Sequence, residues 1–238
     1  MKLRGFTLAE ALLALAILGV VAAMTIPMLA NSRQKQVCSA SLSTAVSDIE
    51  NAMSAMIMGE GADILTETEF YNSESVDGAS DALGKYFEIQ KSQDSPSDFY
   101  GTSSVKGLDA SQVELPEGNS HLSKKGALYI FKKSEDEDKN MSEAEALAKG
   151  TNLSKKAYDL VIDVNGAKKP NTVGRDIFGF AVGDDGHLYS YGSEDYAKYS
   201  KTGTWKDNEG DYSCTDGNSV SGWGCTARLI EHVYKMDY

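Results

Sequence analysis

The sequence has few of the residues that most often carry catalysis. Three histidines occur among its 238 residues. His121, His187 and His232 stand apart, and no serine, cysteine or carboxylate near them forms a recognisable nucleophile arrangement. A phosphate-binding Gly-Lys-Ser/Thr motif is also absent from the sequence. We therefore expect no catalytic residues and no enzyme activity, and an ATPase of the P-loop type is excluded.

Cysteine is equally scarce, with three residues in the chain. No Cys-x-x-Cys pair or nearby histidine completes the four ligands of a zinc site. Cys214 and Cys225 bracket a short glycine-rich loop, and a disulfide between them is the natural pairing if this region lies outside the cytoplasm. Cys38 stands alone upstream. We predict a small buried side chain there, with an intermolecular disulfide as the alternative.

Positive charge is in the minority. The chain has 23 Lys and Arg against 35 Asp and Glu, which gives a formal net charge of -12. Such a chain is poorly suited to bind nucleic acid or an anionic membrane surface by electrostatic attraction. The sequence shows no Lys/Arg cluster of the usual kind, so we expect no nucleic-acid partner.

What the sequence does have is a long apolar run near its N-terminus. No charge interrupts Ala11–Ala30, while Lys2 and Arg4 precede this run and Arg33 and Lys35 follow it. At about 1.5 Å per residue, a helix of this length spans the hydrocarbon core of a bilayer. A secretory signal has a shorter apolar region followed by a small-residue cleavage site. The run therefore predicts a membrane-spanning helix.

One acidic residue, Glu10, stands at the very start of the apolar run. A charge there is costly if it must enter lipid, and a simple membrane anchor gains nothing from it. A polymerising helix can use it, because a carboxylate in an apolar bundle pairs with a buried cation. The amine of a neighbouring chain would supply that cation if cleavage exposes Phe6. Glu10 is therefore interpreted as an assembly residue.

The residues that surround Glu10 resemble a known signal. The segment from Arg4 to Glu10 reads Arg-Gly-Phe-Thr-Leu-Ala-Glu, which is similar to the class III signal of type IV pilins and type II secretion pseudopilins. The resemblance implies that a prepilin peptidase cuts after Gly5 and N-methylates Phe6, and that Glu10 forms a salt bridge with the new amine during assembly. Gly19 and Pro27 stand where the family carries helix-loosening residues.

The resemblance also implies a life cycle. The precursor would cross the inner (cytoplasmic) membrane once, with its head outside the cytoplasm. An inner-membrane assembly platform with its ATPase would then polymerise it with itself and with minor pilins. The product would be an extracellular type IV pilus, a fimbrium that serves motility or cell adhesion. The alternative is a periplasmic pseudopilus of a type II secretion system. A DNA-uptake pilin is less favoured, because the head is acidic.

Four parts are expected along the chain. They are a prepilin leader at 1–5, a transmembrane and polymerisation helix at 6–30, an amphipathic continuation of the helix at 31–58, and a globular α+β head at 59–238 that carries the C-terminal disulfide loop. The continuation has apolar or small residues at helical spacing, with Cys38, Leu42, Ala45, Ile49, Met53 and Met56 on one stripe.

The head carries strand signals of alternating apolar and β-branched residues. We predict strands at 127–131, 158–164, 177–182 and 187–191, the last two joined by the turn at Asp184–Gly186. A surface helix is expected at 142–149. The fold class is therefore α+β, and the resemblance implies a pilin-like lollipop whose helix packs on a roughly four-stranded antiparallel sheet.

The most site-like cluster of the head lies between two of these strands. Asp163, Asn165, Asn171 and Asp176 offer oxygen ligands of the kind that Ca²⁺ prefers. The alternative is a structural loop, because Asn-Gly and Pro-Asn favour turns and Asp caps backbone amides. A related Asp-x-Asn-Gly stretch occurs in pilin-like proteins. A second acidic loop, at 207–211, is a weaker candidate for calcium.

Overall fold

The computed structural model describes residues 7–134, 156–196, 204, 206, 212–214 and 221–238. Contacts within the chain divide it into two units, Met1–Val37 and Cys38–Tyr238. The expected helix at 142–149 and the acidic loop at 207–211 lie outside the described residues, as do the leader and Phe6.

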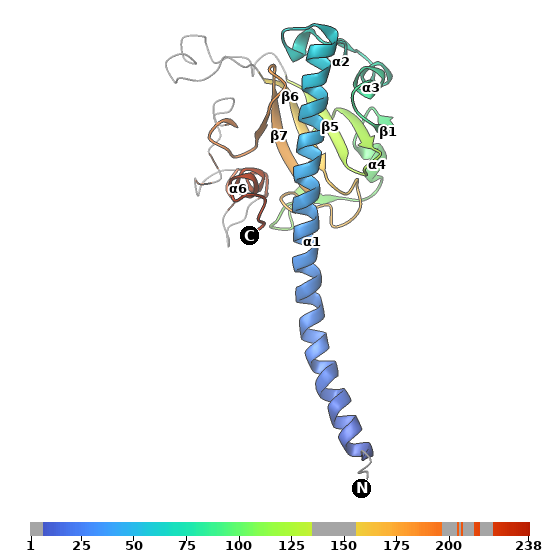
Figure 1. The fold of residues 1–238 in the computed structure, drawn as a ribbon, viewed down its shortest axis with the longest axis vertical. Helices are drawn as coiled ribbons and strands as arrows, with labels where there is room; N and C mark the ends of the chain where they lie inside the picture. The colour runs from blue at the N-terminus through green and yellow to red at the C-terminus, as the bar shows by residue number, and fades with distance from the viewer. Residues whose placement is uncertain (1–6, 135–155, 197–203, 205, 207–211, 215–220) are drawn as a thin grey trace, which may run out of the picture. The chain divides into compact units, whose positions relative to one another are not determined.

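The first element is a single long helix, α1 (Leu8–Glu60), drawn in blue in Figure 1. Alanine, leucine and methionine, all strong helix formers, are frequent in it. It ends in a Schellman motif, because Gly61 takes φ +66° and its N–H bonds the Met58 carbonyl while Ala62 N–H bonds the Ile57 carbonyl. This end lies within two residues of the expected one.

The part of α1 that belongs to the second unit buries one face. The buried residues there are Cys38, Ser39, Leu42, Ala45, Val46, Ile49, Ala52, Met53 and Met56. These include every residue of the predicted stripe, which is therefore confirmed. Cys38 is a free, buried thiol, and burial raises its pKa to about 11.

The head contains a six-stranded antiparallel sheet in the order β1-β4-β5-β6-β7-β8. Its strands are β1 (Ile89–Gln93), β4 (Asn119–Ser123), β5 (Leu128–Lys133), β6 (Lys156–Asp163), β7 (Ile177–Gly183) and β8 (Leu188–Ser190). A separate two-stranded ribbon joins β2 (Val105–Lys106) to β3 (Gln112–Val113). The four predicted strands are present, and β1 and β4 extend the sheet beyond the expected size.

Short helices complete the head. They are the 3₁₀ helix η1 (Leu65–Glu67) and the α-helices α2 (Glu69–Asn72), α3 (Val76–Gly84), α4 (Ser97–Tyr100) and α6 (Cys225–Glu231). Thr68 and Ser75 cap α2 and α3 by accepting hydrogen bonds from the backbone N–H groups of Tyr71 and Gly78.

The sheet buries both faces. One face packs with α1 and carries alternate residues of β6 and β7 and the residue after β6: Tyr158, Leu160, Ile162, Val164, Phe178, Phe180 and Val182. The opposite face holds a second cluster built on Leu128, Ile130 and Val161. A strand covered on both sides reads as a nearly continuous apolar run, as β7 does.

Candidate functional site

The start of α1 holds Glu10 in a capping box with Thr7. The Glu10 carboxylate accepts hydrogen bonds from the Thr7 backbone N–H at 2.9 Å and from the Thr7 hydroxyl at 2.8 Å. The Thr7 hydroxyl accepts one from the Glu10 N–H at 3.3 Å, and the Thr7 carbonyl accepts one from Ala11 N–H. Reciprocal bonds of this kind satisfy amides that a helix leaves free at its start. Glu10 thus has a local role that the sequence reasoning missed, although Thr-x-x-Glu is a readable signal.

The surface of α1 beyond Glu10 is apolar and solvent-exposed in the isolated chain. More than half of the residue surface is exposed at Leu12, Leu13, Leu15, Ile17, Leu18, Val20, Val21, Met24, Ile26, Met28 and Leu29. Within the described residues, α1 is the helix that is long and apolar enough to cross a membrane. An apolar surface of this size needs lipid or other helices to cover it.

Gly19 and Pro27 lie inside α1 without ending it. Pro27 has no backbone N–H and so removes one hydrogen bond of the helix, while a side chain at Gly19 would meet no atom within 4 Å. Both residues lower the cost of opening the helix locally. Their helix-loosening role in assembly stays a prediction, as do cleavage at Gly5 and N-methylation of Phe6, which lie outside the described residues.

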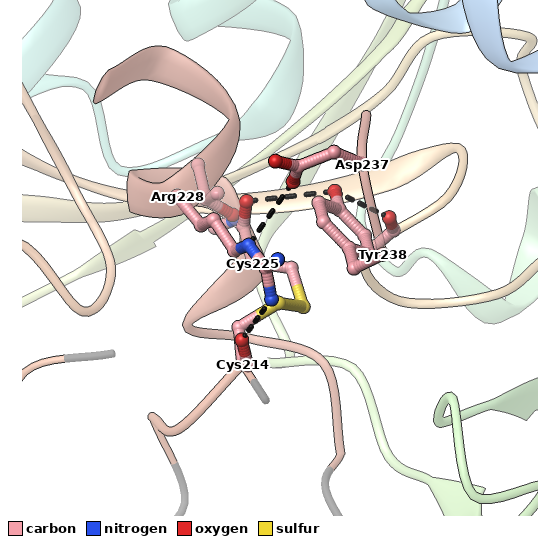
Figure 2. The surroundings of a disulfide bond; sticks show 8 residues. Cys214, Cys225, Arg228, Asp237 and Tyr238 are labelled. Atoms are coloured by element: carbon pink, nitrogen blue, oxygen red, sulfur yellow. Dashed lines mark hydrogen bonds and ion pairs between the residues drawn. A yellow bond between two sulfur atoms is a disulfide. The ribbon is translucent and has the colours of Figure 1, made fainter. Parts of the chain in front are cut away.

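The predicted disulfide is present. Cys214 and Cys225 are bonded, with 4.9 Å between their Cα atoms, and Cys225 begins α6 (Figure 2). Arg228, one turn further along α6, donates a hydrogen bond from Nη1 to the Cys214 carbonyl at 2.7 Å. The disulfide therefore joins α6 to the segment at Cys214, and the arginine reinforces the same connection.

The residues after α6 fold back onto this disulfide. Asp237 accepts from Arg228 Nε at 3.1 Å and lies 2.9 Å from His232 Nδ1, and the contact with His232 is the main cause that lowers the pKa of Asp237. The Tyr238 hydroxyl donates to the Gly174 carbonyl at 2.8 Å, and its ring lies under the Arg228 guanidinium (Figure 2). These contacts give the Lys-Met-Asp-Tyr tail a packing role that sequence reasoning had not provided.

The candidate calcium cluster is brought together, and its first carboxylate is fully occupied. Asp163 accepts hydrogen bonds from the backbone N–H groups of Asn165, Gly166 and Ala167 at 2.9 to 3.0 Å. The Tyr100 hydroxyl donates a fourth at 2.6 Å. Burial raises the pKa of Asp163, and these donors oppose that rise. The side chain therefore organises the turn that follows β6.

The second carboxylate, Asp176, closes the same loop from the other end. It accepts from the backbone N–H groups of Thr172 and Asn171 at 2.7 and 2.9 Å, and from the Asn165 side-chain amide at 3.0 Å. Burial is the main cause that raises its pKa to about 6, with the Asp163 charge adding to the rise.

The fit to calcium is limited by these contacts. Seven protein donors occupy the two carboxylates, whereas the amide oxygens of Asn165 and Asn171 are buried without a hydrogen-bond partner. Ca²⁺ takes six to eight oxygens. Within the described part of the chain, no group of three or more His, Cys, Asp or Glu side chains could hold a metal ion. The contacts favour the turn interpretation, and calcium binding stays a prediction.

The head also contains a serine–histidine contact that the sequence did not indicate. His121 Nδ1 lies 2.8 Å from the Ser92 hydroxyl, which lies 2.8 Å from that of Ser80. His121 is fully buried, and burial lowers its pKa to about 4. Its Nε2 has no partner among the described residues, so no acid orients the ring as a catalytic base requires. The contact is a packing feature of the core.

Comparison with known families agrees with the N-terminal features. Residues 1–26 match the family model of the prokaryotic N-terminal methylation motif, the signature of type IV pilins and pseudopilins. Comparison with curated proteins and with solved structures gives no match. The shared signature therefore covers the leader and most of the apolar run at Ala11–Ala30, and the head is interpreted from its own structure.

Proposed function

We propose that this chain is a structural subunit of a type IV pilus, cut after Gly5, N-methylated at Phe6 and assembled through α1. The methylation motif supports a type IV pilin-like or pseudopilin subunit. One observation carries the proposal. The motif leads into the exposed apolar part of α1, and the later residues of the same helix contribute to the core of an α+β head. Prepilin peptidase and the membrane assembly platform with its ATPase are the partners that follow from it.

In this proposal Glu10 has two successive roles. It caps α1 through Thr7 in the chain before assembly. Within a bundle of helices the same carboxylate would pair with the methylated amine of Phe6 on a neighbouring subunit, because an unpaired charge in an apolar environment is costly. The amine of Phe6 exists only after cleavage, so a subunit could assemble only after it has been processed.

The main alternative is a pseudopilin, whose short periplasmic fibre would drive protein export. The disulfide that holds α6 supports the pilus proposal through the resemblance, because many type IV pilins carry a C-terminal disulfide loop, although the bond itself suits the periplasm as well as the cell surface. Loss of the gene separates the two. A pilus subunit is required for surface filaments and adhesion, and a pseudopilin is required for secretion of folded proteins.

Mass spectrometry of assembled filaments tests the processing step. We expect the first residue of the subunit to be N-methylated Phe6. Filaments that retain Met1 would overturn the proposal.

Two substitutions separate the roles of Glu10. Glu10→Gln keeps a side chain that can complete the capping box but removes the charge, so we expect normal membrane insertion and loss of filaments. Thr7→Ala removes the cap and keeps the charge, so filaments should form. Carbonate-resistant membrane association and electron microscopy of sheared filaments measure the two properties. Normal filaments from Glu10→Gln would refute the pairing role.

A further inference from the structure

Four cations of the head lack an acidic partner and are close together in the fold. Several described lysines of the head form ion pairs, as Lys85 does with Glu69 and Lys125 with Asp48. In the described part of the head, no ion pair or side-chain hydrogen bond involves the following exposed residues, which together form the basic surface: Lys106, Lys168, Lys169 and Arg175.

The backbone brings these residues to one place from two distant segments. Lys106 N–H bonds the Asn171 carbonyl at 3.0 Å, and the Lys106 carbonyl accepts from Val173 N–H at 2.8 Å. Lys169 lies two residues before Asn171, and Arg175 lies two residues after Val173. The ribbon strand β2 is thus fastened to the loop between β6 and β7. The sequence could not show this grouping, because more than sixty residues separate its two parts.

The acids around the basic surface do not neutralise it by direct pairing. Asp163 and Asp176 lie beneath it, but both are buried and accept from N–H and O–H donors. The exposed Asp109 accepts from the backbone N–H and hydroxyl of Ser111. The four cations therefore extend to solvent on a head whose chain has a net charge of -12.

A second surface of the head has the opposite character. The helix α3 packs beside β1, where the hydroxyls of Ser80 and Ser92 are 2.8 Å apart (Figure 1). Exposed acids in α3 and just before it, which have no ion pair or side-chain hydrogen bond among the described residues, form this acidic surface: Glu74, Asp77 and Asp81.

We propose that the basic surface of one subunit docks on the acidic surface of a second copy of this chain. The proposal rests on the proposed function and names a contact between heads within the filament. Subunits of net charge -12 repel one another, and a local contact of opposite charges offsets that repulsion and fixes the register. Because the two surfaces are different parts of one subunit, the contact is heterologous, the type that continues into an open helical filament rather than closing as a dimer.

Nucleic acid is a less suitable partner for the basic surface. Four cations above two buried carboxylates supply few phosphate contacts, and the remaining head would repel a polyanion. A second copy of the chain also supplies cations to pair with the acidic surface, which a nucleic acid cannot do.

Neutralisation of matched lysine pairs in the full-length chain tests the contact. Lys168→Gln with Lys169→Gln removes two unpaired cations, and we expect about tenfold fewer filaments at physiological salt, an effect of a few surface pairs. The control is Lys124→Gln with Lys125→Gln, which changes the net charge equally at an adjacent lysine pair whose charges are met by Glu88 and Asp48. The control should assemble like the unmodified protein.

Charge exchange identifies the partner surface. Lys168→Glu with Lys169→Glu, or Asp77→Lys with Asp81→Lys, should each lower filament yield, and the four changes together should restore it. Unchanged yield from the lysine variants would overturn the contact, and failure of the combination to restore would overturn the acidic surface as its partner. Loss of binding to duplex DNA without loss of filaments would assign the basic surface to nucleic acid instead. If the unmodified chain forms no filaments, the proposed function itself fails.

Discussion

His121 lies in the interior of the head beside the rings of Phe70 and Phe131, with ring centroids at 6.3 and 6.0 Å. Its contact with the Ser92 hydroxyl holds one nitrogen, and the apolar surroundings favour the neutral ring. Neutral histidine in the folded state means that acid must either unfold the head or force a proton into the core. The residue therefore links stability to pH.

Replacement of His121 by Phe should change the pH dependence of stability. The pKa of His121 is lowered from 6.5 to about 4. Its stabilising contribution is therefore complete above pH 6.5 and is lost as pH falls to about 4, a difference on the order of 3 kcal/mol. We expect the unfolding free energy of the unmodified chain, relative to His121→Phe, to rise by that order between pH 4 and 6.5.

Urea unfolding of the detergent-solubilised full chain at several pH values measures this difference. Asp163 and Asp176 have raised pKa values, so their contributions have the opposite slope, but they are common to both proteins and cancel in the comparison. A difference that does not vary with pH would contradict the assignment.

The side chains of α1 differ in burial along the helix, and only the buried ones stabilise the head. Met53 is fully buried against the sheet, whereas Met58, little more than one turn further, is 82% exposed. Met53→Ala should destabilise the head by about 3 kcal/mol through lost apolar contact and a cavity. Met58→Ala should change stability by less than about 0.5 kcal/mol. Equal midpoints in urea would contradict the burial pattern.

The elements that the sequence predicted are those with strong apolar periodicity. The stripe of α1 and the strands β5, β6 and β7 alternate clearly, and the structure confirms them. The strands β1 and β4 read Ile-Gln-Lys-Ser-Gln and Asn-Ser-His-Leu-Ser. They are strands because β5 offers a pairing edge to β4, and β4 offers one to β1. Local composition cannot reveal a strand that is held by its neighbour.

The same limit applies to the candidate site. Glu10, the disulfide and the Asp163 loop follow from short-range patterns or pairings. The pairing of Asp237 with Arg228 depends instead on a chain that turns back after α6, and the sequence carries no signal for it. Contacts set by tertiary packing therefore had to be read from the fold.

At the scale of the whole molecule, the chain combines two units with different needs. The first unit exposes an apolar helix that requires lipid or other helices, and the second is a disulfide-containing head with its own core. A subunit built in this way can be stored in a membrane through one unit while the other folds outside the cytoplasm. A precursor that is processed and then assembled needs both parts, an apolar helix for the membrane and the filament and a head that folds by itself.

Thermal unfolding of the full chain with and without calcium tests the last open assignment of the head. Because Asp163 and Asp176 are occupied by protein donors, the turn interpretation predicts the same Tm in millimolar Ca²⁺ and in EDTA. A calcium site filled at a hundred times its Kd would instead raise the Tm by about 5 °C or more. Mg²⁺ at equal concentration is the control for ionic strength. A rise in Ca²⁺ alone that persists when the acids of the 207–211 loop are replaced by amides would overturn the turn interpretation, whereas an unchanged Tm would leave the loop as a structural turn held by its own amides.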